Sequence, residues 1–421
     1  MIDSNSLYRA RIVDNELSDL LNSSGTVVIE GPKACGKTAT ARQFAASEVL
    51  LDVDEAARLA ARVDPRLILD GRTPRLIDEW QIEPSIWNHI RRAVDERGKP
   101  GQFILAGSCV PTDDITRHSG AGRIARLQMR PMSLYESGHS TGAISLDRLL
   151  AGDSPNSSEI GVSLSDLTER IAIGGWPGLQ GHSIQGALRF VRDYLDEIRR
   201  LDIVRVDGVR RDPENVGRLL RSLARNLSTC VTATALASDV SGSERTINDD
   251  TVRDYIGALR RLMIVEDQQV WAPHLRSRSA ARSSPKRHFV DPSLAVAALR
   301  ITPERLLGDL KLLGYFFESL VVRDLRIYAQ ASDARVLHYR DNTGLEVDAI
   351  VETSDGKWSA WEVKLGPGLV DEGARSLLKF ADRVDTEKCG PPTILGVIIP
   401  GGYGYLRDDG VAVVPIGALG P

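Results

Sequence analysis

Residues 31–38, Gly-Pro-Lys-Ala-Cys-Gly-Lys-Thr, constrain the fold of this chain more than any other stretch. They match the phosphate-loop pattern G-x-x-x-x-G-K-[ST] at every fixed position. The apolar run 26–30 before them predicts a short buried strand, and residues 38–49 after them predict a helix. Residues 6–24 predict an amphipathic helix before that strand, and residues 49–52 predict a further strand. The turn at 31–38 leaves backbone N–H groups free to face phosphates, so the stretch predicts a nucleotide site. In this context, a plain glycine turn is the disfavoured alternative.

This loop supplies most of the predicted nucleotide contacts. Lys37 adds a positive charge beside the phosphates, and the hydroxyl of Thr38 is predicted to bind Mg²⁺. We therefore expect ATP and Mg²⁺ as cofactors. The residues expected to bind the nucleotide are Gly31, Pro32, Lys33, Ala34, Cys35, Gly36, Lys37, Thr38 and Ala39.

A second nucleotide-binding motif follows at residues 74–81, Pro-Arg-Leu-Ile-Asp-Glu-Trp-Gln. A short apolar strand that ends in Asp-Glu is the Walker B pattern. Asp78 is predicted to hold Mg²⁺, directly or through water, and Glu79 to polarise the attacking water, because phosphoryl transfer depends on positioning and charge. Alone, such a string is common and mostly structural. Its place after a phosphate loop favours the catalytic interpretation.

Four motifs together resemble a bacterial and archaeal family of AAA-type ATPases with a carboxy-terminal domain of unknown function. The resemblance covers nearly the whole chain and implies an AAA+ core that hydrolyses ATP. One departure is Trp80, where that family usually has an aliphatic residue; it leaves the magnesium chemistry unchanged. The motifs are the phosphate loop, the I-D-E-x-Q string, the strand F-I-L-A-G-S, and the run G-R-I-x-R-L-x-M-R-P-x-S-L-x-E from Gly122 to Glu136.

The AAA+ layout implies roles for two more residues, by analogy. Ser108 ends the predicted strand 102–108 and takes the position that senses the γ-phosphate; the alternative is a residue that caps the next turn. Arg123 follows a glycine loop at 120–122. It is either an arginine finger supplied to a neighbouring subunit or a surface arginine. The first interpretation implies a homo-oligomer.

Composition limits the class of protein. A length of 421 residues suggests two to four domains. The net charge of −4 neither favours nor excludes nucleic acid. No apolar run is long enough to span a bilayer, and the first residues do not form a secretory signal. The four cysteines are not paired at metal-ligand spacing, so we expect a cytoplasmic protein with free thiols.

The middle of the chain predicts a linker and then helices. Residues 138–163 are rich in Gly, Ser, Asp and Pro and predict a loop or linker. Residues 164–173 and 184–205 predict helices. The Gly-Gly-Trp-Pro-Gly turn at 174–178 separates them, and we assign it a structural role.

Residues 215–272 have the pattern of a winged helix: three helices at 215–226, 234–240 and 248–261, then a wing strand at 263–271. Such modules place one helix in the major groove of DNA, but many serve protein contacts instead. The basic run 276–287 predicts a loop that either contacts phosphates or is simply solvated. The predicted DNA contacts are Arg245, Thr246, Asn248, Arg253, Arg276 and Arg278.

The last third resembles the PD-(D/E)-x-K fold of restriction-type endonucleases. Glu362 and Lys364 lie two apart on a predicted strand and share a face; Asp348 lies on the preceding strand, joined to it by an Asp-Gly turn. With Glu318 from a predicted helix, they are predicted to form a Mg²⁺ site that activates water. The alternative is a structural Glu362–Lys364 pair, and many such domains bind nucleic acid without cutting it.

The sequence therefore predicts an α/β chain: a P-loop AAA+ ATPase core, then a winged-helix module and a restriction-endonuclease-like α/β domain. The predicted boundaries are 1–140 for the core, 141–205 for a linker and helical segment, 206–272 for the winged helix, and 285–421 for the nuclease-like domain. The predicted function is ATP hydrolysis coupled to work on DNA. Two alternatives stay open: an ATP-gated DNA nuclease, and a nucleotide-switched module that binds a protein partner, such as a defence or toxin–antitoxin component.

Overall fold

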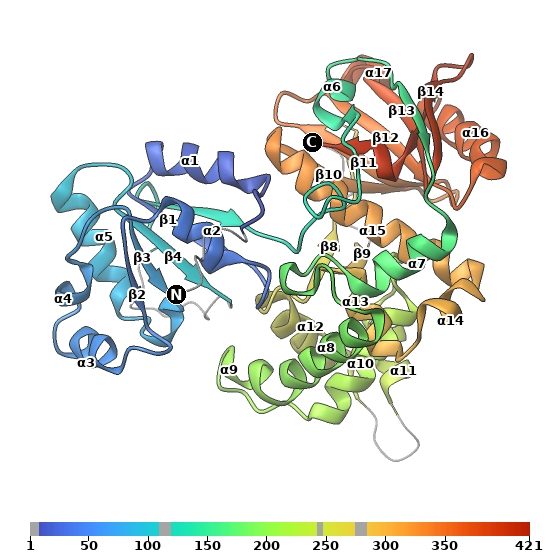
Figure 1. The fold of residues 1–421 in the computed structure, drawn as a ribbon. Helices are drawn as coiled ribbons and strands as arrows, with labels where there is room; N and C mark the ends of the chain where they lie inside the picture. The colour runs from blue at the N-terminus through green and yellow to red at the C-terminus, as the bar shows by residue number, and fades with distance from the viewer. Residues whose placement is uncertain (1–7, 109–118, 242–246, 274–283) are drawn as a thin grey trace.

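The computed structural model describes residues 8–108, 119–241, 247–273 and 284–421. Figure 1 shows an amino-terminal α/β unit on the left and a larger body on the right, which holds the remainder of the chain. Within the described ranges, no helix is both long and apolar enough to cross a membrane.

The amino-terminal unit is built on a five-stranded parallel sheet of order β2-β3-β4-β1-β5. Its helices cover both faces, which explains why its central strands are apolar throughout. α1 and α2 pack on one face, and α3, α4 and α5 on the other. The strands are β1 (Thr26–Glu30), β2 (Ser47–Leu50), β3 (Arg75–Asp78), β4 (Phe103–Gly107) and β5 (Ile124–Gln128); the helices are α1 (Val13–Ser23), α2 (Lys37–Phe44), α3 (Glu55–Val63), α4 (Arg66–Leu69) and α5 (Ile86–Arg97).

Three predicted boundaries in this unit are wrong. The helix after the phosphate loop ends at Phe44 rather than at residue 49, because β2 begins at Ser47 and pairs with β3. That strand was expected at 49–52. The first helix was expected over 6–24 but begins at Val13. Local periodicity does not register the strand pairing that fixes such ends.

The segment 138–163 is not a linker. It forms β6 (Ile144–Ser145), α6 (Leu146–Leu150) and β7 (Ser157–Ile160). β7 pairs with β14 (Gly402–Leu406), and β6 pairs with β16 (Leu419–Gly420). Strands of two to four residues are too short to show an alternating pattern, so the glycine- and serine-rich composition dominated the prediction.

The carboxy-terminal part is a seven-stranded mixed sheet of order β10-β11-β12-β13-β15-β14-β7. α15 (Leu310–Ala331) packs on one face and α16 (Val370–Ala381) on the other. The Asp-Gly turn at 355–356 joins β11 and β12, which confirms the predicted hairpin. The remaining strands are β10 (Ala334–Arg340), β11 (Glu346–Thr353), β12 (Trp358–Val363), β13 (Ile394–Ile399) and β15 (Val411–Pro415), and α17 covers Thr386–Cys389.

A helical part lies between β7 and α15 in the chain. Its first helices are close to the predictions, and the helix predicted over 184–205 runs from α8 through a π-helical stretch at Ile198–Asp202 into α9. The helices are α7 (Leu164–Ile173), α8 (Ile184–Glu197), α9 (Ile203–Arg205), α10 (Pro213–Arg225), α11 (Ala233–Val240), α12 (Asp249–Arg261), α13 (Pro292–Leu299) and α14 (Pro303–Leu307).

The strand predicted at 263–271 is β8 (Val265–Gln268), and it pairs with β9 (Lys286–Phe289). Lys286 and Arg287 were assigned to a basic loop, and this assignment is wrong, because both lie in β9. Three helices followed by an antiparallel strand pair occur in the order that a winged helix requires. The winged-helix assignment itself stays a prediction.

One apolar core joins the helical part to the carboxy-terminal sheet. Residues of α8, α10, α13 and α15 share it with inward-facing residues of β11, β12 and β13. Polar contacts attach the amino-terminal unit to this body: Arg130 donates to Glu266 of β8 at 3.1 Å, and Gln330 of α15 donates to Glu16 of α1 at 2.7 Å. The helical part and the carboxy-terminal sheet are therefore one packed body.

Candidate active site

The phosphate loop lies between β1 and α2, at the carboxyl edge of the parallel sheet. Gly36 has φ of +107°, a left-handed conformation that glycine adopts without strain. At Gly31, a Cβ atom would lie 2.3 Å from the carbonyl oxygen of Met129. The loop therefore requires glycine at both positions, for two different reasons.

Lys37 is folded onto its own loop. Its Nζ donates to the carbonyl oxygens of Gly31 at 2.9 Å and Pro32 at 2.8 Å, and the residue is 6% exposed. These bonds satisfy a buried ammonium group and hold it at the rim of a cavity. Lys37 is thus placed where the phosphate-loop pattern predicts.

Thr38 and Asp78 are adjacent although they are forty positions apart. The Thr38 hydroxyl donates to Oδ2 of Asp78 at 2.9 Å. Burial raises the pKa of Asp78, and the bond from Thr38 opposes that shift. Oδ1 of Asp78 is buried and has no hydrogen-bond partner among the described residues. A hydroxyl and a carboxylate with a spare oxygen fit Mg²⁺, so the structure brings the two predicted ligands together.

Glu79 follows Asp78 with φ of +51°, which is unusual for a residue with a side chain. Its carboxylate accepts from the hydroxyl of Ser108 at 3.3 Å and from the side-chain amide of Gln81. Gln81 also donates to Ser108 at 3.4 Å. The predicted residues Glu79 and Ser108 are therefore in contact, and Gln81 joins them without having been predicted.

A cavity of about 780 Å³ opens beside these groups. One wall comes from the phosphate loop and from the segment that follows β3, with Glu79 and Gln81. The opposite wall comes from the helical part, in the form of Asp202, Arg205 and Leu262. Nζ of Lys33 lies 2.6 Å from Oδ1 of Asp202, and Arg205 lies 3.7 Å from the same oxygen. The sequence predicted Lys33 but neither Asp202 nor Arg205.

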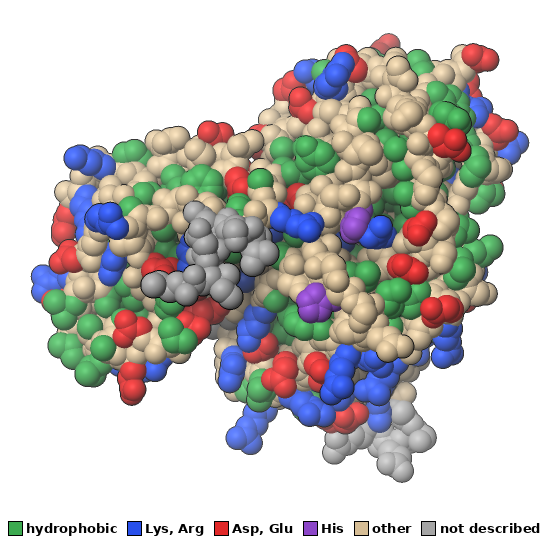
Figure 2. Space-filling model, in the orientation of Figure 1, with side chains coloured by type: hydrophobic (Ala, Val, Ile, Leu, Met, Phe, Trp, Pro, Cys, Tyr) green, Lys and Arg blue, Asp and Glu red, His purple; other side chains and the backbone are tan. Residues whose placement is uncertain are grey.

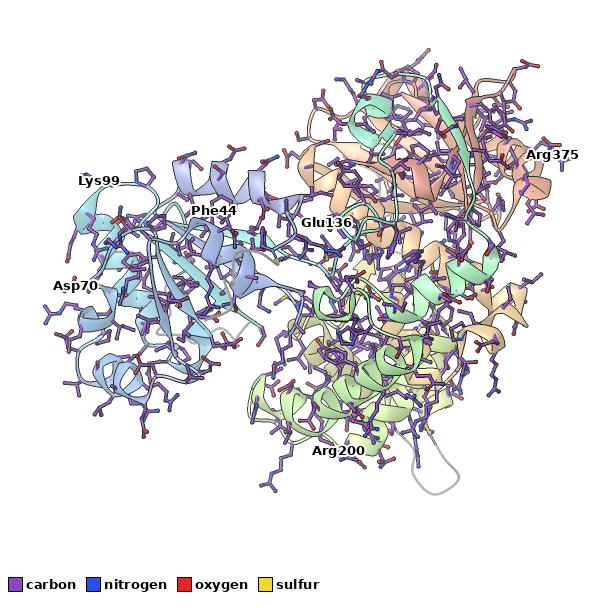
Figure 3. The ribbon with its side chains drawn as sticks, viewed as in Figure 1. Phe44, Asp70, Lys99, Glu136, Arg200 and Arg375 are labelled. Atoms are coloured by element: carbon purple, nitrogen blue, oxygen red, sulfur yellow. The ribbon has the colours of Figure 1, made fainter. Side chains whose placement is uncertain are left out.

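Arg11 holds the backbone of the phosphate loop through hydrogen bonds. The sequence did not predict this role. Arg11 donates to the carbonyl oxygens of Cys35 at 2.9 Å and Arg130 at 2.7 Å, and forms an ion pair with Glu136 at 3.0 Å. Figure 3 shows Glu136 where the two bodies meet. Glu136 belongs to one of the recognised motifs, but nothing in the sequence identified its partner.

Arg123 lies away from this site. It directly precedes β5, and its carbonyl oxygen accepts from the backbone N–H of Thr26 at the start of β1. It is therefore at the edge of the sheet opposite the phosphate loop, and its side chain pairs with Asp95 at 2.8 Å. It does not reach the cavity of its own chain. A role toward a second chain stays a prediction.

The four residues of the predicted nuclease-like site come together beside the carboxy-terminal sheet, but with a fifth residue. Lys286 Nζ lies 2.7 Å from Glu318 and 3.2 Å from Asp348. Lys364 Nζ lies 3.1 Å from Glu362. Among the described residues, no group of three acidic, His or Cys side chains is arranged to hold a metal ion. The Mg²⁺ site predicted for these residues stays a prediction.

The predicted DNA contacts on α12 are engaged within the chain. The side chain of Asn248 caps the helix by accepting from the backbone N–H of Thr251 at 2.8 Å. Arg253 pairs with Asp250 at 2.9 Å and Asp249 at 3.6 Å. The first turn thus carries two acids, which repel DNA phosphates. Arg245, Thr246, Arg276 and Arg278 lie outside the described residues.

Exposed arginines occur instead on α10, at spacings of three and four residues. Arg218, Arg221 and Arg225 share one exposed face. Arg225 pairs with Asp239 at 2.6 Å, whereas Arg218 and Arg221 have no ion-pair partner within the described ranges. Figure 2 shows lysine and arginine side chains along the lower edge of the molecule, where Figure 1 places the helical part.

Comparison with known proteins supports the site at the phosphate loop. Residues 23–138 match the family model of an AAA domain, which spans the phosphate loop, Asp78, Glu79 and Ser108. This match supports a P-loop ATPase domain. Residues 164–305 and 313–419 match two domains of unknown function, DUF8612 and DUF4143. These descriptions name no activity, so the nuclease-like assignment stays a prediction.

Two relatives that match most of this chain are uncharacterized proteins, so they indicate no function. An uncharacterized protein of Mycobacterium tuberculosis and one of Mycobacterium bovis are each 24% identical over 415 residues, covering 97% of this chain and 84% of the relative. A solved structure, the Walker-type ATPase PABY2304 of Pyrococcus abyssi, aligns with a TM-score of 0.43 and 14% identity over 68% of this chain and 94% of that chain.

Proposed function

We propose that this chain binds ATP with Mg²⁺ in the cavity between the phosphate loop and the helical part, and hydrolyses it there. The observation that carries the proposal is the Thr38–Asp78 contact of 2.9 Å beside a buried carboxylate oxygen that has no partner among the described residues. A bound Mg²⁺ supplies charge that neutralises the phosphates. Thr38 and Asp78 are the residues that would hold it.

The remaining residues position the reactants. Lys37 can exchange one of its bonds to the loop backbone for a phosphate oxygen. The loop N–H groups face the same oxygens. Glu79 orients the attacking water, and Ser108 and Gln81 fix its carboxylate, because both contact it. This division of roles suits a reaction that depends on positioning and electrostatics.

Arg205 is the residue proposed to stabilise charge on the transferred phosphoryl group. It lines the cavity from the helical part of the same chain, and its side chain is 70% exposed and therefore free to move. Asp202 is its partner in the present arrangement. Hydrolysis through Arg205 needs no neighbouring subunit, in contrast to the predicted role of Arg123.

The experiment that tests this function is phosphate release from ATP with Mg²⁺, and again with the metal chelated. Asp78→Asn should remove the Mg²⁺-dependent rate. Asp70→Asn is the matched control, since Asp70 is 87% exposed on the same unit (Figure 3). A wild-type rate in Asp78→Asn would refute the proposed site.

A second candidate function is that hydrolysis serves work on DNA. The exposed arginines of α10 favour it, because unpaired guanidinium groups at helical spacing match a phosphate backbone. The test is the hydrolysis rate with no DNA, single strands, duplex and branched DNA. A rate indifferent to all of them would favour the protein-partner alternative.

A further inference from the structure

Five charged side chains gather beside the carboxy-terminal sheet, and they come from distant parts of the chain. Glu318 lies in the middle of α15, Asp348 on β11, Glu362 near the end of β12 and Lys364 directly after it. The fifth, Lys286, begins β9, which is paired with β8 in the helical part. The helical part therefore contributes one residue to this cluster of the carboxy-terminal sheet.

Lys286 is placed between two carboxylates. Its Nζ lies 2.7 Å from Oε1 of Glu318 and 3.2 Å from Oδ1 of Asp348, and its side chain is only 4% exposed. The other oxygen of Asp348 accepts from the backbone N–H of Val363 at 3.0 Å. Both oxygens of Asp348 are thus already used within the chain.

The third carboxylate is satisfied in the same way. One oxygen of Glu362 lies 3.1 Å from Lys364, and the other accepts from the hydroxyl of Ser376 at 3.3 Å. Lys364 also lies 3.3 Å from Glu372. Each acid of the predicted nuclease-like site therefore has an ammonium partner, which provides the compensation that a buried carboxylate requires.

We propose that the ammonium group of Lys286 takes the position that a divalent cation would occupy between Glu318 and Asp348, so that this cluster binds no divalent cation and cleaves no phosphodiester. Mg²⁺ needs oxygens at about 2.0–2.1 Å on several sides. Two cations cannot share the same two carboxylates at that distance, because their repulsion adds to the cost of removing both from water. Lys286 gives both Glu318 and Asp348 an ammonium partner without a metal.

The protonation of the cluster is consistent with this assignment. Burial lowers the pKa of Lys286, but Glu318 and Asp348 outweigh it and raise that pKa above its ordinary value. Burial, and then the charge of Asp348, raises the pKa of Glu318 to about 8. A charged Lys286 and a Glu318 whose pKa is raised by burial fit a buried cluster that holds one positive charge.

The test titrates Mn²⁺ alone into the full chain by calorimetry, without nucleotide. Wild type and Asp348→Asn should give the same curve, because the wild-type cluster binds no ion. Lys286→Ala should gain one Mn²⁺ per chain, and its melting temperature should rise with Mn²⁺. The double variant Lys286→Ala, Asp348→Asn should lose that gain. Any weak Mn²⁺ binding at the nucleotide site is the same in all four proteins, so it does not affect the differences between their titration curves.

Two outcomes would overturn the proposal. One is a Mn²⁺ ion bound by wild type and lost in Asp348→Asn, together with Mn²⁺-dependent cutting of plasmid DNA by wild type alone. The other is a folded Lys286→Ala that gains no ion. Even if Lys286→Ala does not fold, the comparison of wild type with Asp348→Asn decides whether the natural cluster holds a cation.

Discussion

Nζ of Lys33 in the phosphate loop lies 2.6 Å from Oδ1 of Asp202, which comes 169 positions later at the end of the π-helical stretch. Asp202 is almost fully buried, whereas the side chain of Lys33 is partly exposed. The contact places a carboxylate in the wall of a cavity proposed to receive triphosphate. Nucleotide binding and the position of the helical part are therefore expected to be coupled.

Asp202→Asn should strengthen ATP binding. The change removes a negative charge that repels the phosphates and frees Lys33 to approach them, and a gain of about 1 kcal/mol, roughly fivefold in Kd, is the scale for a partly exposed pair. Fluorescence titration with a labelled ATP analogue measures it. Asp193→Asn, which removes an exposed acid from α8, is the control. Weaker binding would mean that Asp202 chiefly holds the loop in shape.

Glu79→Gln should separate binding from hydrolysis. The amide keeps the size of the side chain and can still contact Ser108, but it cannot polarise water, so kcat should fall about 10²-fold or more with little change in Kd for ATP. Single-turnover and binding assays measure the two quantities. Glu83→Gln, four residues on and paired with Arg62, should change neither. An unchanged kcat in Glu79→Gln would remove Glu79 from the reaction.

Arg205→Ala should lower the kcat of ATP hydrolysis, whereas Arg123→Ala should leave it unchanged. Loss of Arg205 removes a cation from the cavity and should lower kcat at least tenfold, a modest share of what an arginine in this role contributes. Loss of Arg123 removes the pair with Asp95 and a hydrogen bond to the carbonyl oxygen of Ala121, both at the far edge of the sheet. Activity per chain should also be independent of protein concentration. A larger loss of kcat in Arg123→Ala than in Arg205→Ala would favour a site completed by a second chain.

Replacing Arg218 and Arg221 together by Ala should weaken DNA binding. Each phosphate contact contributes about 0.9 to the slope of log K against log salt, so the double variant should reduce that slope by about 2. Arg253→Ala should leave the slope unchanged, because Arg253 is paired with the acids of α12. Fluorescence anisotropy at several salt concentrations distinguishes them. Equal slopes in all three proteins would exclude this face of α10.

The free energy of unfolding should fall between pH 7 and 8.5 because the pKa of Glu318 is raised in the folded chain. Its folded pKa of about 8 lies above the unfolded value near 4.5, so the folded chain holds a proton that the unfolded chain releases. The resulting stabilisation is complete below the unfolded pKa and is lost as pH rises through the folded one, by about 1 kcal/mol over this window. Urea denaturation measures it. Glu318→Gln should flatten the decline, and a slope equal to wild type would contradict this assignment.

The contact between Thr38 and Asp78 could be predicted because the sequence signals of the amino-terminal site are local. A strand, a glycine turn and a helix lie within twenty residues, and Asp78 and Glu79 end a recognisable apolar strand. Parallel strands bring their carboxyl ends to one edge, so the pattern alone implied that Thr38 and Asp78 meet. The hairpin that carries Asp348 and Glu362 was predictable for the same reason.

The residues that were missed act across long separations. Arg11 reaches Glu136, Asp202 reaches Lys33, and Lys286 reaches Asp348, each pair more than sixty positions apart. No motif marks such a residue, since a single charged side chain is ordinary on any surface. Only the packed tertiary structure shows that Lys286 is buried and that Arg205 faces the cavity.

The strand β7 has a consequence for how the chain is made. Its partner β14 is distant: 247 positions separate Ser157 from Gly404, whose backbone N–H donates to the Ser157 hydroxyl. At about 5–20 residues per second, a ribosome takes roughly 12–50 seconds to supply that partner after β7 has emerged. The amino-terminal unit, whose strands all precede residue 130, can be complete by then. During that interval β7 is a nascent sheet edge without its partner, and the helical part must fold while tethered to it.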